Sequence, residues 1–319
     1  MLLILMADSI ASLKNMNIMS FGQIRTLVLP VGGLGMRFLP ATKAIPKEML
    51  PVAGKPLAQY AFEEARKAGI ERFIFVTGRN KTSIEDHFDS AFELEKTLEN
   101  KKKLDLLDKT TGWMPEAGQI TFLRQQRPLG LGHAVLCAEK FVGNEMFAVC
   151  LADDMSYSQG GNYLLDMIKL ANTKSSSVLG IAEVPEEDVS KYGIVDVEEN
   201  RGDILKIVGM VEKPSLDTAP SKLACIGKYI LNPSIFKYLK MIKPGVNSEI
   251  QLTDAIKMAI DNGESYYGLV FGDIRFDCGS VLGYLEANVH YALKDKNINN
   301  AVKKVIDKFY RDIHGETQD

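Results

Sequence analysis

The chain has 319 residues, of which 46% are hydrophobic and 25% are charged, and its formal net charge is −3. This length supports a substantial core, arranged as one large domain or two small ones. The slight negative charge argues against a protein that binds nucleic acid through bulk electrostatics, because such proteins gather many Lys and Arg side chains. Any phosphate binding must therefore depend on local groups of cations.

Residues 1–24 are interpreted as a flexible N-terminal extension. The apolar run from Leu2 to Met6 is too short for a membrane span, and no basic residues precede it as they would in a secretory signal. Met16 and Met19 lie just before the first predicted strand, so an upstream start codon also explains this segment. We expect the main domain at residues 25–295 and a C-terminal helix or tail at 296–319.

An apolar strand ending at Val31 leads into a glycine-rich loop with nearby cations. The residues concerned are Gly32, Gly33, Gly35, Arg37, Lys43 and Lys47. Glycines can adopt left-handed conformations and allow backbone N–H groups to approach phosphate oxygens, while the cations add charge. The pattern predicts a polyphosphate site.

Two common glycine signatures do not fit this loop. A Walker loop requires Gly-Lys followed by Ser or Thr, and the dinucleotide-binding fingerprint requires a third glycine at the start of a helix. Here Pro40 and Pro46 are expected to keep the chain extended after Arg37. A simple surface turn is the alternative for Gly33-Leu34-Gly35 taken alone.

After the loop, strands and helices alternate as in a parallel sheet with crossover helices. The predicted elements are a helix at 56–68 that stops at Gly69, a buried strand at 73–77, a solvated helix at 93–109, a strand at 120–123, a helix at 134–141 and a strand at 146–151. The last strand carries Asp153 to the carboxyl end of the sheet, where open α/β sheets bind ligands. Asp153 and the glycine loop are therefore expected to converge.

Asp153 is a candidate Mg²⁺ ligand, because magnesium prefers a few carboxylates together with substrate phosphates and water. Asp154 should point elsewhere, since successive side chains of an extended chain face opposite sides. A turn or a helix cap is the alternative for this Asp-Asp pair.

From Ser177 onward the sequence is rich in strand-forming residues. Strands are predicted at 178–184, 193–197, 204–211 and 224–231, with a turn at 200–203, and helices at 233–239, 250–261, 281–293 and 299–314. We interpret these strands as an extension of the same sheet.

The four cysteines are widely spaced and form no Cys-x-x-Cys pair. Cys137, Cys150, Cys225 and Cys278 are therefore interpreted as reduced thiols of a cytosolic protein. A zinc site is the alternative, but no histidine lies at ligand spacing from a cysteine.

The segment 33–51 resembles the signature of the sugar-nucleotide pyrophosphorylases, most closely that of the bacterial UTP–glucose-1-phosphate uridylyltransferases. Further matching segments follow in the family's order at 124–125, 130–135, 151–154, 211–214 and 249–256. The resemblance extends from about Arg25 to Tyr291. It implies an α/β, Rossmann-like nucleotidyltransferase fold, with a mixed, mostly parallel central sheet flanked by helices and a β-rich sugar-binding extension, and it makes 25–295 the catalytic domain.

The resemblance implies an enzyme that transfers the uridylyl group of UTP to α-D-glucose 1-phosphate, giving UDP-glucose and pyrophosphate. The attacking phosphate oxygen is already anionic at neutral pH, so positioning and electrostatic stabilisation should dominate and no general base is required. The implied cofactor is Mg²⁺, and the implied assembly is a homodimer or homotetramer. We expect a cytoplasmic protein with no nucleic-acid or membrane partner.

The implied catalytic roles follow the path of the phosphates. Arg37 would stabilise the β- and γ-phosphates and the departing pyrophosphate, because a guanidinium binds phosphate oxygens bidentately. Lys47 would approach the α-phosphate as a compact charge. Asp277 resembles the position of a second metal carboxylate, although a helix cap before Val281 is an alternative.

The implied sugar and base contacts lie later in the chain. Glu212 would accept hydrogen bonds from glucose hydroxyls and Lys213 would bind the sugar phosphate, yet strand alternation would separate these side chains unless Pro214 ends the strand. Gln125 would read the uracil edge beside Gly130. The other glycines of interest, whose alternative is an ordinary turn or sheet irregularity, are Gly193 and Gly227 at the sugar pocket.

Some positions depart from the family's pattern. Met36 stands where Thr is usual, so one hydroxyl donor to phosphate is missing. Gly32 replaces Ala, Ala152 replaces Pro or Gly, and the segment 245–248 is less glycine-rich than expected. None of these changes removes a charged group on which the mechanism depends.

Three other functions fit parts of the pattern. The first is a thymidylyl- or cytidylyltransferase that acts on a sugar 1-phosphate with the same fold. The second is a catalytically silent nucleotide-sugar-binding regulatory protein, which would have no need of the metal and leaving-group residues. The third is a dehydrogenase, which the loop spacing disfavours.

Overall fold

The structure is a computed structural model that describes residues 24–198, 202–245 and 248–315. The expected N-terminal extension, apart from Ile24, lies outside the described residues. So do residues 200–201 of the predicted turn and residues 246–247 of the segment that departs from the family pattern. Within the described part of the chain, no helix is long and apolar enough to cross a membrane.

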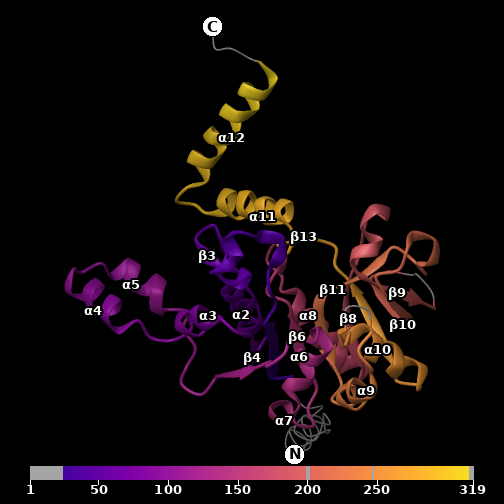
Figure 1. The fold of residues 1–319 in the computed structure, drawn as a ribbon. Coiled ribbons are helices and arrows are strands. Elements are labelled where there is room, and N and C mark those ends of the chain that lie inside the picture. Colours follow the sequence, from indigo (N-terminus) through magenta and orange to yellow (C-terminus); the bar gives the residue numbers. More distant parts are fainter. Residues whose placement is uncertain (1–23, 199–201, 246–247, 316–319) are drawn as a thin grey trace, which may run out of the picture.

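The centre of the fold is a mixed sheet of nine strands in the order β5-β4-β1-β6-β11-β8-β12-β10-β9 (Figure 1). Its first four strands are β5 (Ile120–Arg124), β4 (Arg72–Thr77), β1 (Thr26–Val31) and β6 (Phe147–Cys150), and they are mutually parallel. This half is the parallel sheet predicted from the sequence.

The second half of the sheet begins at β11 (Leu223–Leu231), which runs antiparallel to β6. The remaining strands are β8 (Ser177–Glu183), β12 (Tyr266–Val270), β10 (Ile204–Glu212) and β9 (Gly193–Val197). Only the β12–β8 pair is parallel among them. The β-rich region after Ser177 is therefore an extension of the same sheet, as predicted.

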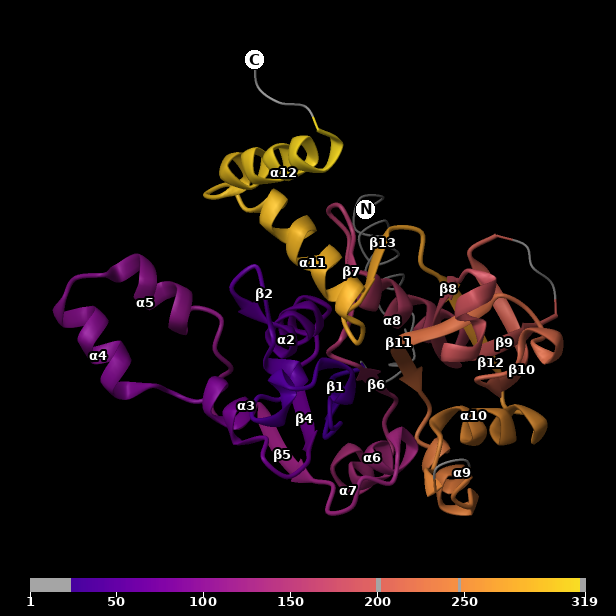
Figure 2. The ribbon, with the colours of Figure 1, turned by 45° about the horizontal axis from the view of Figure 1, so that its top comes forward.

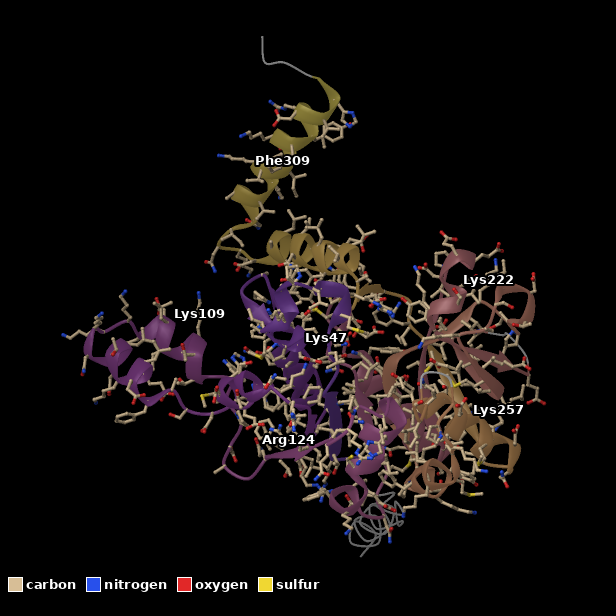
Figure 3. All side chains as sticks on the ribbon, viewed as in Figure 1. Lys47, Lys109, Arg124, Lys222, Lys257 and Phe309 are labelled. Atoms are coloured by element: carbon tan, nitrogen blue, oxygen red, sulfur yellow. The ribbon has the colours of Figure 1, made fainter. Side chains whose placement is uncertain are left out.

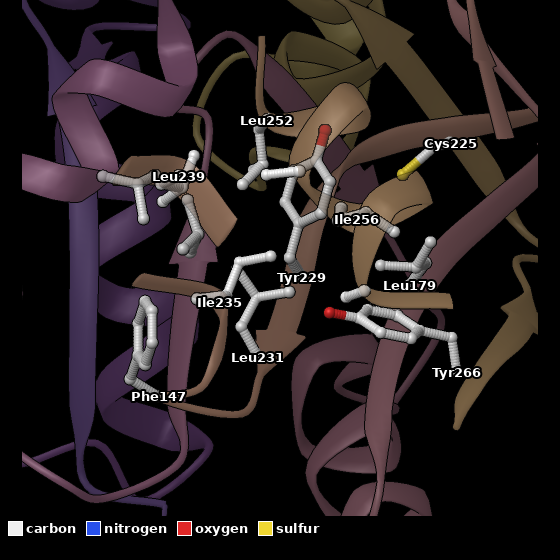
Figure 4. Close-up of a cluster of buried hydrophobic side chains, with 14 of the residues drawn as sticks. Phe147, Leu179, Cys225, Tyr229, Leu231, Ile235, Leu239, Leu252, Ile256 and Tyr266 are labelled. Atoms are coloured by element: carbon white, nitrogen blue, oxygen red, sulfur yellow. The ribbon is translucent and has the colours of Figure 1, made fainter. Parts of the chain in front are cut away.

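Helices cover both faces of the sheet. One face packs against α6 (Leu131–Cys137), α7 (Glu139–Val142), α9 (Ile235–Met241) and α10 (Leu252–Asp261), and the other against α2 (Leu57–Lys67), α3 (Thr82–His87) and α8 (Tyr163–Lys174). Strand β1 serves both cores, because Val28 points into the first while Leu27 and Leu29 point into the second. Figure 4 shows part of the first core around Tyr229 and Leu231 of β11.

Two short antiparallel pairs lie outside the main sheet. They are β7 (Asp154–Tyr157) with β13 (Ile274–Asp277), and β2 (Pro51–Val52) with β3 (Lys55–Pro56). A third core beneath α11 (Val281–Lys294) joins both pairs to the body through Val52, Met155 and Phe276. The β7–β13 pair matters for function because it places Asp154 opposite Asp277.

Three helices extend away from the sheet. In both Figure 1 and Figure 2, α4 (Phe92–Asn100) and α5 (Leu104–Thr111) stand apart on the side of β4 and β5, and α12 (Asn299–His314) projects beyond α11. The prediction of a single solvated helix at 93–109 was wrong, because two helices occupy this range. The chain breaks between α4 and α5, where Lys102 adopts a φ of 54°, a left-handed conformation that cannot continue a helix.

Two other local predictions also needed correction. The helix predicted at 134–141 is divided into α6 and α7 at Ala138. The chain after Arg37 is not extended but forms three 3-10 turns, at Met36–Phe38, Ala41–Lys43 and Lys47–Met49. The prolines initiate the last two of these turns rather than preventing them, because the fixed φ of Pro suits the entry to a helical turn.

A buried cation lies on the central strand β11. Lys228 is only 2% exposed, and its Nζ donates to Oε2 of Glu64 in α2 at 2.9 Å and to the backbone carbonyl of Asp154 at 3.4 Å. Burial lowers the pKa of Lys228, but Glu64 and other nearby groups together raise it above its ordinary value, so the ammonium stays charged. This ion pair links α2 to β11 next to the start of β7.

We therefore expect Glu64→Gln to destabilise the fold, because it removes the counter-charge of a buried ammonium. The expected loss is at least about 2 kcal/mol in the free energy of unfolding, measured by urea titration. Glu145→Gln is the matched control. Its partner Arg72 is 48% exposed, so the same change there should cost less than about 1 kcal/mol. Equal losses in the two variants would contradict the importance of the buried pair.

Candidate active site

Two adjoining cavities open at the carboxyl ends of β1 and β6. The larger, of about 470 Å³, is lined by the glycine loop, Lys47, Gln125 and Gly130. The smaller, of about 190 Å³, is lined by Arg37, Gly193, Gly227 and Asp277. Their shared wall comprises Leu131, Leu151, Asp153, Glu212, Lys213 and Gln251. The fold thus brings together every site residue predicted from the sequence, whereas Lys43 of the loop lines neither cavity.

The glycine loop leaves β1 and folds over Lys47. Gly35 has a left-handed φ of 67°, and Thr42 Oγ1 donates to its carbonyl at 2.7 Å. A β-carbon at Gly33 would lie 3.4 Å from Cε of Lys47, so the lysine runs directly beside the loop. Met36 is 71% exposed at the rim of the larger cavity.

Lys47 and Asp153 form the central ion pair, which Figure 3 locates through the labelled Lys47 in the middle of the molecule. Lys47 Nζ lies 2.5 Å from Asp153 Oδ2. Burial alone would raise the pKa of Asp153, but the Lys47 ammonium and its hydrogen bond lower it below its usual range. For Lys47, burial lowers the pKa while Asp153 and Glu48 raise it, with a net increase. Both groups therefore remain ionised at neutral pH.

Asp153 and Asp277 approach each other around Gly279. A β-carbon built on Gly279 would lie 2.9 Å from Asp277 Oδ1, 3.0 Å from Asp153 Oδ2 and 3.4 Å from Arg37 Nη1. Asp277 is fixed by a hydrogen bond from Tyr192 OH at 2.8 Å and one from the Gly279 N–H at 3.0 Å. The glycine thus preserves a small space between two carboxylates.

This pair of carboxylates suits magnesium. The described residues contain no group of three or more His, Cys, Asp or Glu side chains arranged to hold a metal ion by themselves. Magnesium is commonly held by one or two carboxylates, with phosphates and water as its other ligands. Asp153 and Asp277 fit that requirement.

Asp154 has different partners from Asp153, but the reason is a turn at residues 152–153 and not the strand alternation expected from the sequence. Its two oxygens accept hydrogen bonds from Arg275 Nε at 2.9 Å and Nη2 at 2.7 Å, and Oδ2 also accepts from the Gly227 N–H at 2.9 Å. The Arg275 guanidinium also lies over the ring of Tyr192, 5.0 Å from its centroid. Asp154 is therefore engaged in holding the site together.

Glu212 and Lys213 lie on the shared wall and form an ion pair of 3.0 Å. Strand alternation does not separate their side chains because β10 ends at Glu212 and Lys213 adopts a φ of 46°. This left-handed conformation is uncommon for lysine and often marks a functional position. Thr253 Oγ1 donates to Glu212 Oε2 at 2.9 Å and orients the carboxylate.

The glycines predicted at the base and sugar contacts occupy places where a side chain would collide with its neighbours. Gly130 has a φ of 95°, and a β-carbon there would lie 2.8 Å from Cβ of Glu249. At Gly193 the nearest atom would be Cγ2 of Thr253 at 2.7 Å, and at Gly227 it would be Cβ of Asp154 at 2.7 Å. These close approaches exceed what an ordinary turn requires.

Several further residues support the site, although no role for them was predicted from the sequence. Glu48 is 1% exposed, and its Oε2 accepts from Lys81 Nζ at 2.8 Å, while its Oε1 has no hydrogen-bond partner among the described residues. Burial raises the pKa of Glu48 although Lys81 and Lys47 oppose that shift. Tyr192, Arg275 and Thr253 were also missed. Their partners are distant in sequence, so no local pattern could have identified them.

Comparison with known proteins gives consistent results. Residues 26–294 match the nucleotidyl transferase family. The chain is 45% identical over 284 residues to a UTP–glucose-1-phosphate uridylyltransferase from Staphylococcus epidermidis, an alignment that covers 89% of this chain and 98% of that protein. It is also 43% identical to the UDP-glucose pyrophosphorylase of Acinetobacter baumannii, with a TM-score of 0.82 over 90% of this chain and 99% of the other.

Two similar solved structures contain ligands. One is a UTP-bound UDP-glucose pyrophosphorylase from Acinetobacter baumannii, with 44% identity and a TM-score of 0.81 over 89% of this chain and 98% of the other. The second is a UDP-glucose pyrophosphorylase complexed with UDP-glucose, with 44% identity and a TM-score of 0.75 over 85% of this chain and 100% of the other.

Gly227→Ala should destabilise the smaller cavity, because its β-carbon would meet Cβ of both Asp154 and Leu151 within 3 Å. We expect a loss of about 2 kcal/mol in the free energy of unfolding. Gly272→Ala is the control, since a β-carbon at that position meets no atom within 4 Å. It should change stability by no more than about 0.5 kcal/mol. Urea titration of both variants tests this, and an unaffected Gly227→Ala would show that the close approach is unimportant.

Proposed function

The chain belongs to the nucleotidyl transferase family, and from this premise we propose that it transfers the uridylyl group of UTP to α-D-glucose 1-phosphate, giving UDP-glucose and pyrophosphate. The observation that carries the proposal is the meeting of a larger and a smaller cavity at Asp153, Glu212 and Lys213. The names of the similar proteins support the same substrates. The catalytic unit would comprise residues 25–295.

Each cavity would hold one substrate. UTP fits the larger cavity, with its base toward Gln125 and Gly130 and its phosphates along the glycine loop. Glucose 1-phosphate fits the smaller cavity, where Glu212 would accept hydrogen bonds from sugar hydroxyls close to Gly193 and Gly227. The attacking phosphate oxygen and the α-phosphorus then meet at the shared wall.

The chain's own residues would promote the reaction mainly by binding and orienting two anions. Lys213 would hold the sugar phosphate and Lys47 the α-phosphate, so that the attacking oxygen is aligned with the bond that breaks. Arg37, which lines the smaller cavity, would reach across the shared wall to the β- and γ-phosphates and stabilise the charge on departing pyrophosphate. No residue needs to remove a proton, because the sugar phosphate is already an anion.

We propose Mg²⁺ as the cofactor, held by Asp153 and Asp277. Phosphoryl-transfer enzymes generally use a divalent cation, and when bound it would offset negative charge on the triphosphate and on the leaving pyrophosphate. Because Asp153 is paired with Lys47 in this structure, metal binding and the release of Lys47 toward phosphate would be coupled.

The main alternatives differ in the base or in the presence of catalysis. A thymidylyl- or cytidylyltransferase would use the same phosphate residues and differ around Gln125. A silent regulatory protein would bind nucleotide sugars without needing Arg37, Lys47 and the two carboxylates, all of which line the cavities here. The dehydrogenase alternative disagrees with the family match.

We also propose a homodimer or homotetramer that assembles through the C-terminal helices, in a reducing cytoplasmic compartment. All four cysteines are free thiols. Helix α12 carries an apolar stripe that includes Val305, Ile306, Phe309, Tyr310 and Ile313, and its side chains are 39–78% exposed. A second copy of this chain would cover the stripe, since α12 projects from the body (Figure 1) and these apolar residues are exposed.

Pyrophosphate release tests the proposed reaction. With glucose 1-phosphate and Mg²⁺, we expect release with UTP and much less with dTTP, CTP, ATP or GTP, and a chelator should abolish it. Asp153→Ala should reduce the rate at least about 100-fold. The control is Asp166→Ala, whose carboxylate is exposed on α8.

The possible contrary results have different meanings. A strong preference for another nucleotide would identify a sister transferase. An absence of release together with tight UDP-glucose binding would favour the silent regulatory protein.

The assembly is tested by placing charge on the apolar stripe. Phe309→Asp combined with Ile313→Asp should convert the oligomer to smaller species in light scattering, because two buried carboxylates would be desolvated without partners. Lys304→Asp is the control on the polar side of α12. A doubly substituted protein with the wild-type mass would rule out this interface.

A further inference from the structure

The side-chain amide of Gln125 forms a hydrogen bond with His133. Gln125 directly follows β5, is 9% exposed and lines the larger cavity. Its Nε2 lies 3.1 Å from the Gly130 carbonyl oxygen and 3.0 Å from His133 Nδ1. His133 lies within the family motif at 130–135, but the motif predicts no role for it.

These two contacts determine which way the Gln125 amide faces. A backbone carbonyl can only accept hydrogen bonds, so the amide nitrogen must be the atom that faces Gly130. His133 Nδ1 then accepts the second amide hydrogen, and the imidazole proton is on Nε2. Both hydrogens of the amide are therefore engaged within the protein.

The remaining polar atom of Gln125 is its oxygen. A β-carbon at Gly32 would lie 3.3 Å from Oε1, which places this oxygen beside the glycine loop and the larger cavity. Gln125 is thus presented to a bound base as an acceptor alone, although a free amide could donate or accept.

The surroundings of His133 favour this arrangement. Burial lowers the pKa of His133, so the ring is neutral at neutral pH and Nδ1 keeps its lone pair. Cys137 Sγ lies 3.9 Å from the same nitrogen, one turn further along α6, and is a more distant partner than the amide at 3.0 Å. The amide of Gln125 is therefore the principal partner of Nδ1.

An acceptor at this position discriminates between pyrimidines. Uracil carries a hydrogen on N3, which can donate to Oε1, whereas N3 of cytosine carries a lone pair that would face the oxygen. An unpaired or opposed polar group in a closed site costs substantial binding energy. We propose that His133 is a positioning residue that fixes Gln125 as an acceptor and so makes the larger cavity select uracil over cytosine. This inference rests on the proposed uridine nucleotide site.

Equilibrium binding of UDP-glucose and CDP-glucose, measured by calorimetry, tests the inference without requiring turnover. We expect His133→Leu to reduce the preference for UDP-glucose at least about tenfold, because the amide loses one of two restraints and can rotate. His133→Asn should retain most of the preference, since its Oδ1 can accept the same hydrogen. A separate turnover assay should show an unchanged KM for glucose 1-phosphate in both variants.

A further comparison separates positioning from a general structural effect. In a Gln125→Leu background, His133→Leu should not alter the base preference any further, because His133 acts through Gln125. A wild-type protein without preference, a His133→Leu protein that keeps its preference within about twofold, or a His133→Asn protein no better than His133→Leu would each overturn the inference. If His133→Leu does not fold, two single variants decide the inference: His133→Asn must keep most of the base preference and Gln125→Leu must lose it.

The failure of this inference can be distinguished from failure of the proposed reaction. A protein that releases no pyrophosphate but shows the expected binding preferences would retain the His133 assignment and lose the transferase. A protein that releases pyrophosphate from UTP but whose base preference does not depend on His133 would retain the transferase and lose the His133 assignment. A protein that does not bind UDP-glucose would lose both.

Discussion

The site depends on the opposite directions of two adjacent carboxylates at the turn after β6. Asp154 is held by both nitrogens of the Arg275 fork and by the Gly227 N–H, on the side of β7 and β11. The chain turns at Ala152 and Asp153, where the Asp154 N–H donates to the Leu151 carbonyl at 3.2 Å, and the Asp153 carboxylate meets Lys47 instead. Strand β7 is thus a support that fixes the direction of Asp153, and the pairing with β13 brings Asp277 to the same place.

Close backbone approach is the second requirement of this arrangement. Gly227 lets β11 touch the Asp154 turn, Gly279 leaves room between Asp153 and Asp277, and Gly193 lets β9 approach Thr253. In each case a β-carbon would lie within 3 Å of a neighbouring atom. Larger side chains would not fit at these positions, because protein interiors are densely packed. The shape of the two cavities therefore depends on backbone positions as much as on charged side chains.

The sequence predicted the parallel half of the sheet well because its signals are local. Apolar runs and the helix stop at Gly69 are signals within a few residues of sequence. The family motifs located the residues that line the cavities. Elements such as β7 and β13 were not predicted, since each has four residues and is stabilised by pairing across a long sequence separation. The same reason explains why the partners of Asp154, Asp277 and Glu212 became visible only in the structure.

The electrostatic character of the site also differs from the one suggested by the loop. The sequence indicated a cationic cradle, but among the described residues that line the two cavities the charged side chains are five cations and six carboxylates. They are Arg37, Lys47, Lys191, Lys213, Arg275, Glu48, Asp153, Asp154, Glu212, Glu249 and Asp277. Burial raises the pKa of Glu48. If Glu48 were protonated, the numbers of positive and negative side chains in this set would be equal, and there would still be no excess of positive charge.

Two polyanionic substrates brought into a site without excess positive charge would repel each other strongly, since Coulomb energies grow as water is excluded. The lining residues must therefore act through their positions more than through their total charge, and two of the cations lie beside carboxylates that they could exchange for phosphates. Lys47 on Asp153 and Lys213 on Glu212 are two such pairs, at 2.5 and 3.0 Å. In the proposed reaction a divalent cation would supply the remaining charge, and Asp153 and Asp277 would be its protein ligands.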